Sequence, residues 1–173
     1  MFESDIRIFG KHAIYMKTYS RDKQGENQYP FKLKDNENNV KIVYVFETMI
    51  KCYLIAAMIG VIEKRKAPED NSDKSIYANI MTEQVRSNRI NLKRVVQHMI
   101  LASEEGSVDG RVKKAFSLKT FEDKEVEKEL NDYARGGLEI IHELFEPCRT
   151  YEDAANAIFQ LAESYGVYPI EED

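Results

Sequence analysis

One short segment of the chain carries three side chains that could do chemistry. Residues 132–145 read DYARGGLEIIHELF and include Arg135, Glu139 and His142. An arginine can stabilise a phosphorane while an imidazole moves protons near neutral pH. Arg135 and His142 are separated by six residues, so a continuous helix would place them on one face, about two turns apart. The two side chains must also converge in space for such chemistry, which a sequence cannot establish.

The spacing of Arg135 and His142 resembles the loose Arg-x(4–6)-His signature of HEPN-type ribonucleases. These are small all-helical proteins of prokaryotic defence and toxin systems. The resemblance implies that arginine and histidine side chains from paired subunits act on RNA phosphates and the ribose 2′-hydroxyl. The chain departs from the pattern at Gly136, where the family has a polar residue directly after the arginine. Arg135 and His142 are therefore the catalytic residues of an alternative hypothesis, a HEPN-like ribonuclease.

Glu139 and His142 also form a Glu-x-x-His motif, which in di-iron helical bundles directs a carboxylate and an imidazole toward a metal pair. Such a site needs a second Glu-x-x-His motif, and neither His12 nor His98 has a glutamate three residues before it. We predict no metal site and no cofactor.

The adjacent glycines Gly136 and Gly137 interrupt a segment that otherwise has helical spacing. Neither a dinucleotide-binding nor a P-loop motif surrounds them. Each glycine inside a helix costs roughly 1 kcal/mol relative to alanine, so a pair of them indicates a geometric need. We predict that they form a packing notch, with Gly137 buried against a neighbouring helix such as the one containing Ala56 and Ala57. An exposed Gly137 would instead favour a ligand-binding loop.

The composition is that of a globular protein: 173 residues with 43% hydrophobic and 32% charged side chains. We predict an all-α fold, a single compact domain of five or six helices with a flexible N-terminal arm. Its parts would be an N-terminal segment and polar loop (1–44), a helical core (45–166) and an acidic tail (167–173). The longest apolar run, residues 52–62, is too short to span a bilayer, which needs about 20 residues. The expected location is the cytoplasm, without membrane contact, and both cysteines are expected to be free thiols.

Two regions before residue 106 have helical patterns. Residues 46–66 are nearly all apolar at their centre, which predicts a central buried helix that Thr48 caps. Residues 74–105 are expected to form two helices, with Asn91 as the cap between them. The first of these two helices is predicted from the spacing of four apolar residues: Ile76, Tyr77, Ile80 and Val85.

The second half of the chain predicts two further helices. Apolar residues from Val126 to Phe145 keep helical spacing through the glycines, which indicates one long helix. Thr150 and Asp153 form a near capping box that begins the last helix, and Gly166 is its expected end.

Charge is distributed unevenly. Residues 1–100 contain 17 Lys and Arg against 12 Asp and Glu, a balance of +5, whereas residues 101–173 contain 8 against 18, a balance of −10. This asymmetry indicates either a basic face toward nucleic acid or an acidic partner, or merely the way solvated faces are distributed. The strongest candidates for nucleic-acid binding are Arg86, Arg89, Lys93 and Arg94. The second candidate cluster, which also suits a charge cap at a helix end, is Lys64, Arg65 and Lys66.

Two segments, FETMIKCYLIAAMIGVIEKRK and NDYARGGLEIIHELF, resemble small accessory proteins associated with bacterial DNA phosphorothioation (Dnd) systems. That family has an aromatic residue, an alanine, any residue and then Gly-Gly-Leu-Glu-Ile, which matches residues 133–140. The resemblance covers about residues 46–145 and carries no catalytic residues. It implies a non-catalytic accessory protein of a prokaryotic DNA-modification or anti-phage defence system. Its expected partners are larger proteins of that system, with DNA and a second copy of the chain as further candidates.

Overall fold

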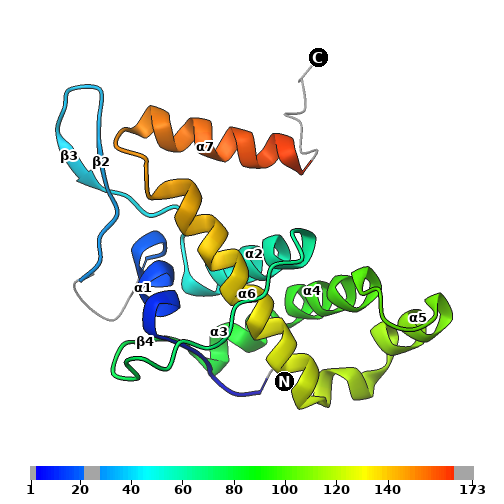
Figure 1. Ribbon diagram of the computed structural model, residues 1–173. Helices are drawn as coiled ribbons and strands as arrows, with labels where there is room; N and C mark the ends of the chain where they lie inside the picture. The colour runs from blue at the N-terminus through cyan, green and yellow to red at the C-terminus, as the bar shows by residue number, and fades with distance from the viewer. Residues whose placement is uncertain (1–2, 22–27, 166–173) are drawn as a thin grey trace.

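The structure is a computed structural model that describes residues 3–21 and 28–165 (Figure 1). The predicted acidic tail and part of the polar loop lie outside the described residues. The described part is mostly helical, with seven α-helices, one 3-10 helix and four short strands. In chain order they are β1 (Ile6–Phe9), α1 (Gly10–Tyr19), β2 (Lys32–Lys34), β3 (Val40–Ile42), α2 (Met49–Ile62), β4 (Tyr77–Ile80), α3 (Thr82–Ser87), α4 (Arg89–Ala102), α5 (Val108–Phe116), η1 (Leu118–Glu122), α6 (Lys124–Phe145) and α7 (Tyr151–Ser164).

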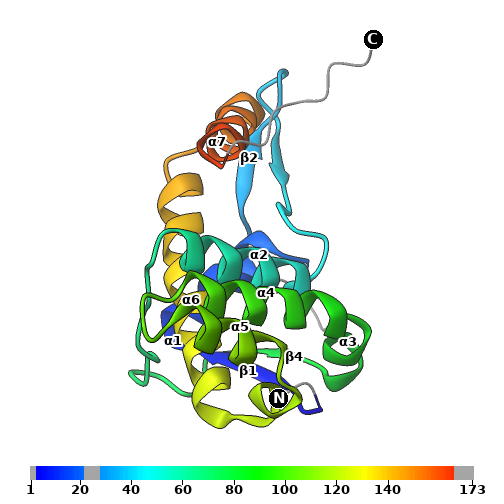
Figure 2. The ribbon, with the colours of Figure 1, turned by 90° about the vertical axis from the view of Figure 1, so that its right-hand side faces the viewer.

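Helices α2 and α6 form the centre of the molecule and make its most extensive interhelical contact (Figures 1 and 2). The predicted central helix is confirmed as α2, most of whose residues are buried. Its predicted cap is confirmed too, because the Thr48 hydroxyl accepts a hydrogen bond from the Lys51 N–H at 3.4 Å. The predicted long helix is α6, which is continuous through both glycines.

The glycine pair lies where α6 crosses α2 and the chain that follows it. A Cβ atom added to Gly137 would lie 1.8 Å from the carbonyl oxygen of Ala56, and one added to Gly136 would lie 2.0 Å from that of Arg65. Both distances are far below van der Waals contact, and both obstacles are backbone atoms. The prediction that Gly137 is buried against the Ala56 helix is confirmed.

A third glycine approaches from the other side of the same crossing. A Cβ on Gly60 of α2 would lie 2.1 Å from the carbonyl oxygen of Tyr133 on α6. The two helices therefore approach each other through reciprocal glycine notches, and neither backbone leaves room for a side chain at these points.

The N-terminal segment differs from the predicted arm. β1 pairs with β4 in an antiparallel ladder in which Ile6 is opposite Ile80 and Phe9 is opposite Tyr77. The prediction that Tyr77 and Ile80 lie on a helix was therefore wrong, and the fold is not strictly all-α. β4 has only four residues, too few for a clear period, and its partner strand lies some 70 residues earlier in the chain. The prediction of a flexible arm is also wrong for α1, because this helix is packed into the core. Its buried residues include His12, Ala13, Met16 and Tyr19.

Asn91 is not the cap between the two helices of residues 74–105. It lies inside α4, and the junction between α3 and α4 falls at Asn88. The Asn88 side chain donates a hydrogen bond to the carbonyl of Gln84 at 2.9 Å, which holds the end of α3. The amide therefore satisfies a carbonyl of the preceding helix and caps no N–H of the next one.

The last helix begins as predicted. Thr150 and Asp153 form a capping box at the start of α7, since each side chain accepts a hydrogen bond from the backbone N–H of the other residue. The predicted end at Gly166 lies outside the described residues. Ala154 and Ala157 are the buried residues of α7, so this helix is only lightly packed onto the rest of the molecule.

We predict that Gly137→Ala destabilises the protein by about 3 kcal/mol, because the added methyl group must displace the α2 backbone. Alanine ordinarily stabilises a helix relative to glycine by about 1 kcal/mol, so the expected effect has the opposite sign. Gly137→Leu should cost more. Urea unfolding measures the free energy of unfolding.

Gly110→Ala is the matched control, because a Cβ there would meet only the Ser107 side-chain oxygen, at 3.1 Å. This change should remain within about 1 kcal/mol of the parent protein. If Gly137→Ala were as well tolerated as Gly110→Ala, the close crossing would be refuted.

Candidate functional site: the polar stripe of α6

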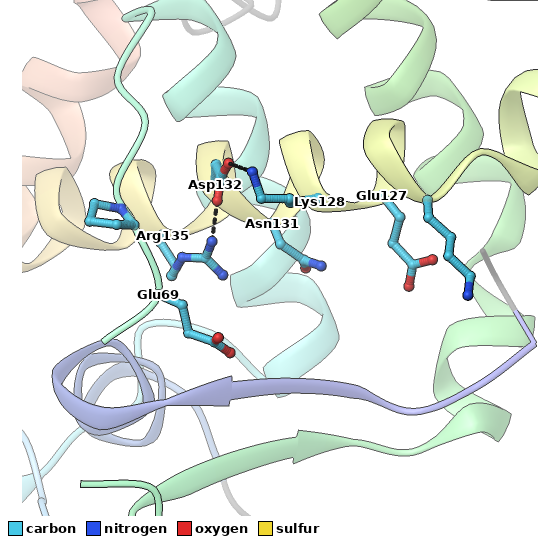
Figure 3. A pocket seen from close by; sticks show the side chains of 8 residues that line it. Glu69, Glu127, Lys128, Asn131, Asp132 and Arg135 are labelled. Atoms are coloured by element: carbon cyan, nitrogen blue, oxygen red, sulfur yellow. Dashed lines mark hydrogen bonds and ion pairs between the residues drawn. The ribbon is translucent and has the colours of Figure 1, made fainter. Parts of the chain in front are cut away.

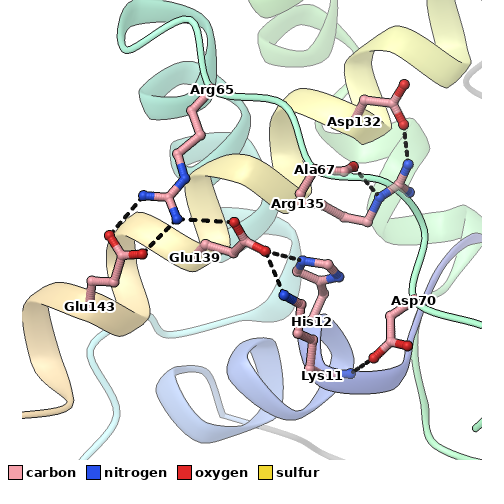
Figure 4. Close-up of polar contacts among 9 residues, drawn as sticks. All are labelled: Lys11, His12, Arg65, Ala67, Asp70, Asp132, Arg135, Glu139 and Glu143. Atoms are coloured by element: carbon pink, nitrogen blue, oxygen red, sulfur yellow. Dashed lines mark hydrogen bonds and ion pairs between the residues drawn. The ribbon is translucent and has the colours of Figure 1, made fainter. Parts of the chain in front are cut away.

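A line of polar side chains follows one side of α6 and faces α1 and the segment after α2 (Figure 4). From Asp132 to His142 its members follow one another at steps of three or four positions, and Glu143 lies four positions after Glu139, which places them on one side of a helix. We call them the α6 polar stripe: Asp132, Arg135, Glu139, His142 and Glu143. The stripe contains every residue that the sequence suggested for catalysis.

Glu139 is the centre of the stripe. Its Oε1 accepts hydrogen bonds from Lys11 Nζ at 2.8 Å and from His12 Nε2 at 3.2 Å, and its Oε2 accepts one from Arg65 Nη2 at 3.1 Å. The side chain is 18% exposed. Burial alone would raise the pKa of this carboxyl group, but the hydrogen bonds from Lys11, His12 and Arg65 outweigh it and lower the pKa to about 2. Glu139 is therefore a carboxylate that joins α6 to α1 and to the chain after α2.

Arg65 also donates two hydrogen bonds to Glu143, from Nη1 to Oε2 at 2.7 Å and from Nη2 to Oε1 at 2.6 Å. The other two cations of this basic cluster each form an ion pair with one glutamate, Lys64 with Glu104 and Lys66 with Glu129. The cluster that the sequence offered as a second nucleic-acid site thus lies next to acidic partners of the same chain. Its position at the end of α2 suits the alternative interpretation as a charge cap.

His12 is 1% exposed and lies between Glu139 and the ring of Tyr15, which it meets edge-on with ring centroids 6.1 Å apart. Burial lowers its pKa, although the neighbouring carboxylate of Glu139 opposes this effect. The neutral imidazole can donate only one hydrogen bond, and the acceptor at Nε2 is a carboxylate, so we assign the proton to Nε2. Among the described residues, Nδ1 has no hydrogen-bond partner. The ring therefore helps to position Glu139.

His142 is held by two tyrosines of α1. Its ring stacks on Tyr15 with centroids 3.9 Å apart and planes inclined by 15°, and its Nδ1 lies 2.9 Å from the Tyr19 hydroxyl. Burial raises the pKa of Tyr19 and lowers that of His142. A protonated tyrosine therefore donates to a neutral imidazole, and this nitrogen of His142 is already occupied.

Arg135 is buried, and its guanidinium binds groups of the same chain. Its Nε donates to the carbonyl oxygen of Ala67 at 2.9 Å, and its Nη2 pairs with Asp132 (Figure 4). The side chain lines a groove of about 520 Å³ between α6 and the segment after α2 (Figure 3). Arg135 and His142 do share one side of α6, as predicted, but they have separate partners, and Glu139 with its cations lies between them.

Sequence reasoning missed Lys11 and His12. They belong to α1, nearly 130 residues before Glu139, and the sequence around them contains no motif that signals a pairing. The signal in the sequence was weak: a basic residue and a histidine lie side by side in a segment that contains several aromatic residues.

The basic residues of α3 and α4 have a different environment from those around α6. Arg86, Arg89 and Arg94 are exposed, and the ion pairs of the described residues do not include them. Lys93 is half-buried, with its ammonium 5.1 Å from the centroid of the Phe121 ring. Three of the four predicted nucleic-acid contacts therefore face solvent, and the fourth belongs partly to the packing of the core.

Neither cysteine is placed for nucleophilic chemistry. Cys52 and Cys148 are buried free thiols, and burial raises the pKa of each. In residues 3–21 and 28–165, no three side chains of His, Cys, Asp or Glu come together where they could hold a metal ion.

Comparison of the chain with protein-family models, with curated proteins and with solved structures finds no match in any of the three. Within the described part of the chain, no helix has the length and apolar character that crossing a membrane would require.

We predict that Glu139→Gln lowers the free energy of unfolding at pH 7 by about 2 kcal/mol, a value that allows for the half-exposed Lys11. Since folding depresses the pKa of Glu139 to about 2, its contribution is complete above the unfolded-state pKa and is lost as the pH falls toward 2. The difference between parent and variant should therefore shrink on acidification. Denaturant unfolding at several pH values measures it.

Glu104→Gln is the control, because Glu104 pairs with Lys64 on an exposed surface and should contribute little. A constant difference between parent and Glu139→Gln from pH 7 to acid would contradict the role assigned to the Glu139 carboxylate.

Proposed function

We propose that the protein is a non-catalytic accessory protein of a prokaryotic DNA-modification or anti-phage defence system. In this role it binds larger proteins of that system and contacts DNA through the basic residues of α3 and α4. The observation that supports the proposal is a contrast: the side chains of α6 that could do chemistry are engaged within the chain, whereas Arg86, Arg89 and Arg94 face solvent. The defence context rests on the resemblance of residues 46–145 to Dnd accessory proteins.

The contacts of α6 argue for a structural use of its polar residues. Catalysis on a phosphate would need Arg135 and His142 to reach the same group. The guanidinium of Arg135 is directed to Ala67 and Asp132, and the imidazole of His142 is stacked on Tyr15. Freeing either side chain would remove hydrogen bonds from partly buried groups, which is costly.

The basic residues of α3 and α4 are suited to phosphate contacts. Arg86, Arg89 and Arg94 come from two consecutive helices and are exposed. Arginine binds phosphate oxygens through two parallel hydrogen bonds. Such contacts position a protein on DNA without reading its sequence, which suits an accessory role.

A HEPN-like ribonuclease remains the second candidate. The observation in its favour is that Arg135 and His142 lie on one side of a continuous helix and that Arg135 borders a groove. We expect the purified protein to leave RNA intact. RNA cleavage that His142→Ala abolishes, and that the control His98→Ala on α4 preserves, would establish the ribonuclease and overturn the accessory role.

We predict that DNA binding is salt-dependent and falls when Arg86, Arg89, Lys93 and Arg94 are all changed to Gln. Each lost phosphate contact should reduce the slope of log K against log salt by about 0.9. Fluorescence anisotropy with duplex DNA at several salt concentrations measures this slope.

The control variant changes Lys64 and Lys66 to Gln, because both are paired with carboxylates of the same chain. Binding that is unaffected by the four-residue variant would refute the DNA-contacting surface.

The accessory role has its own test in the native host. We expect the tagged protein to co-purify with a subunit of a modification or restriction system, and the adjacent genes to encode sulfur-transfer or phosphorothioate-dependent restriction proteins. Neighbouring genes without such functions would remove the Dnd context.

A further inference from the structure

Helix α5 exposes its larger apolar side chains and buries a small one. Val108, Val112 and Phe116 are four positions apart and all are exposed, with Phe116 at 64%. Leu118, the first residue of η1, is exposed as well. Ala115 is the buried residue of α5. We call Val108, Val112, Phe116 and Leu118 the α5 apolar face.

Helix α7 has two apolar faces, and the larger side chains are on the outer one. The inner face packs on the molecule through the buried Ala154 and Ala157 and the partly buried Leu161. Tyr151 and Ile158 are seven positions apart, which is about two turns, and both are exposed, as is the adjacent Phe159 at 59%. We call Tyr151, Ile158 and Phe159 the α7 outer face.

The two segments that carry these faces have opposite net charges. Residues 108–119 contain four basic side chains and one acidic one, a balance of +3: Arg111, Lys113, Lys114 and Lys119 against Asp109. Residues 151–164 contain three acidic side chains and no basic one, a balance of −3: Glu152, Glu163 and the capping residue Asp153. An apolar strip with charges of one sign fits a second strip with charges of the other sign.

The two faces do not meet within one chain. α7 lies at the top of both views, beside the β2–β3 hairpin, whereas α5 lies in the lower half of both (Figures 1 and 2). A second copy of the chain can supply the complementary face.

We propose that the protein forms a homodimer in which the acidic α7 outer face of each copy packs on the basic α5 apolar face of the other. A two-fold axis makes this contact twice. The duplication matters, because a single pair of short helices buries little, and stable interfaces cover about 1,200–2,000 Å² in total. The inference is independent of the proposed function, since it uses neither the α6 polar stripe nor the basic residues of α3 and α4.

Two substitutions test the pairing, Phe116→Glu on α5 and Phe159→Glu on α7. Each should weaken dimerisation about tenfold or more, since aromatic side chains dominate interface energetics. Ile90→Glu is the matched control, because Ile90 is an equally exposed apolar residue (68%) on α4, outside both faces. Sedimentation velocity over a range of concentrations gives the dissociation constant, and circular dichroism checks that each variant is folded.

Mixing the two variants identifies which helices pair. A mixed dimer has one contact that carries both substitutions and one that is unaltered, so the mixture should dimerise more tightly than either variant alone. Pairing of α5 with α5, or of α7 with α7, would give no such recovery. The proposal is overturned by a monomeric parent protein, by a dimer that neither substitution weakens, or by a mixture that does not recover.

A charge exchange replaces these variants if either of them fails to fold. Changing Lys113 and Lys114 to Glu should weaken the dimer, and adding Glu152→Lys and Glu163→Lys in the same chain should restore it. Failure of the second pair to restore the dimer would contradict the proposal.

Discussion

The close approach of α2 and α6 is the constraint on which the rest of the structure depends. Gly60, Gly136 and Gly137 let the two backbones come so near that a methyl group at any of these positions would overlap a carbonyl oxygen. The chain leaving α2 must therefore pass directly over α6. This path brings Arg65 to Glu139 and Glu143, and brings the Ala67 carbonyl to Arg135. The glycines permit the close crossing, and the crossing brings the partners of the polar α6 side chains within reach.

Those contacts explain why a helix at the centre of the molecule carries so many charges. A partly buried charge is stable only when it is paired and hydrogen-bonded. Glu139 meets this requirement with three cationic or imidazole donors, and Arg135 meets it with Ala67 and Asp132. Residues that the sequence suggested for catalysis thus connect α6 to α1 and to the chain after α2. The surfaces that we propose for DNA and for a second copy of the chain lie away from this centre, on α3 to α5 and on α7.

The sequence predicted the elements whose signals are local. The apolar pattern of α2, the continuity of α6 and the Thr150 capping box each depend on residues within a few turns, and the buried Gly137 follows from its position on the apolar side of α6. β4 was mistaken for helix because its partner β1 is distant in the chain. The site was only half predictable: helical spacing places Arg135 and His142 on one side, but it cannot reveal that α1 and the chain after α2 engage them.

We propose that the α6 polar stripe holds the fold together and does not act on a substrate. The most direct test is an NMR titration of the ring resonances of His12 and His142, with and without an RNA oligonucleotide. Because burial lowers both pKa values, we predict that both rings titrate below the ordinary value of about 6.5 and that RNA leaves their shifts unchanged. A His142 ring that titrates at or above this value and shifts on addition of RNA would contradict the account.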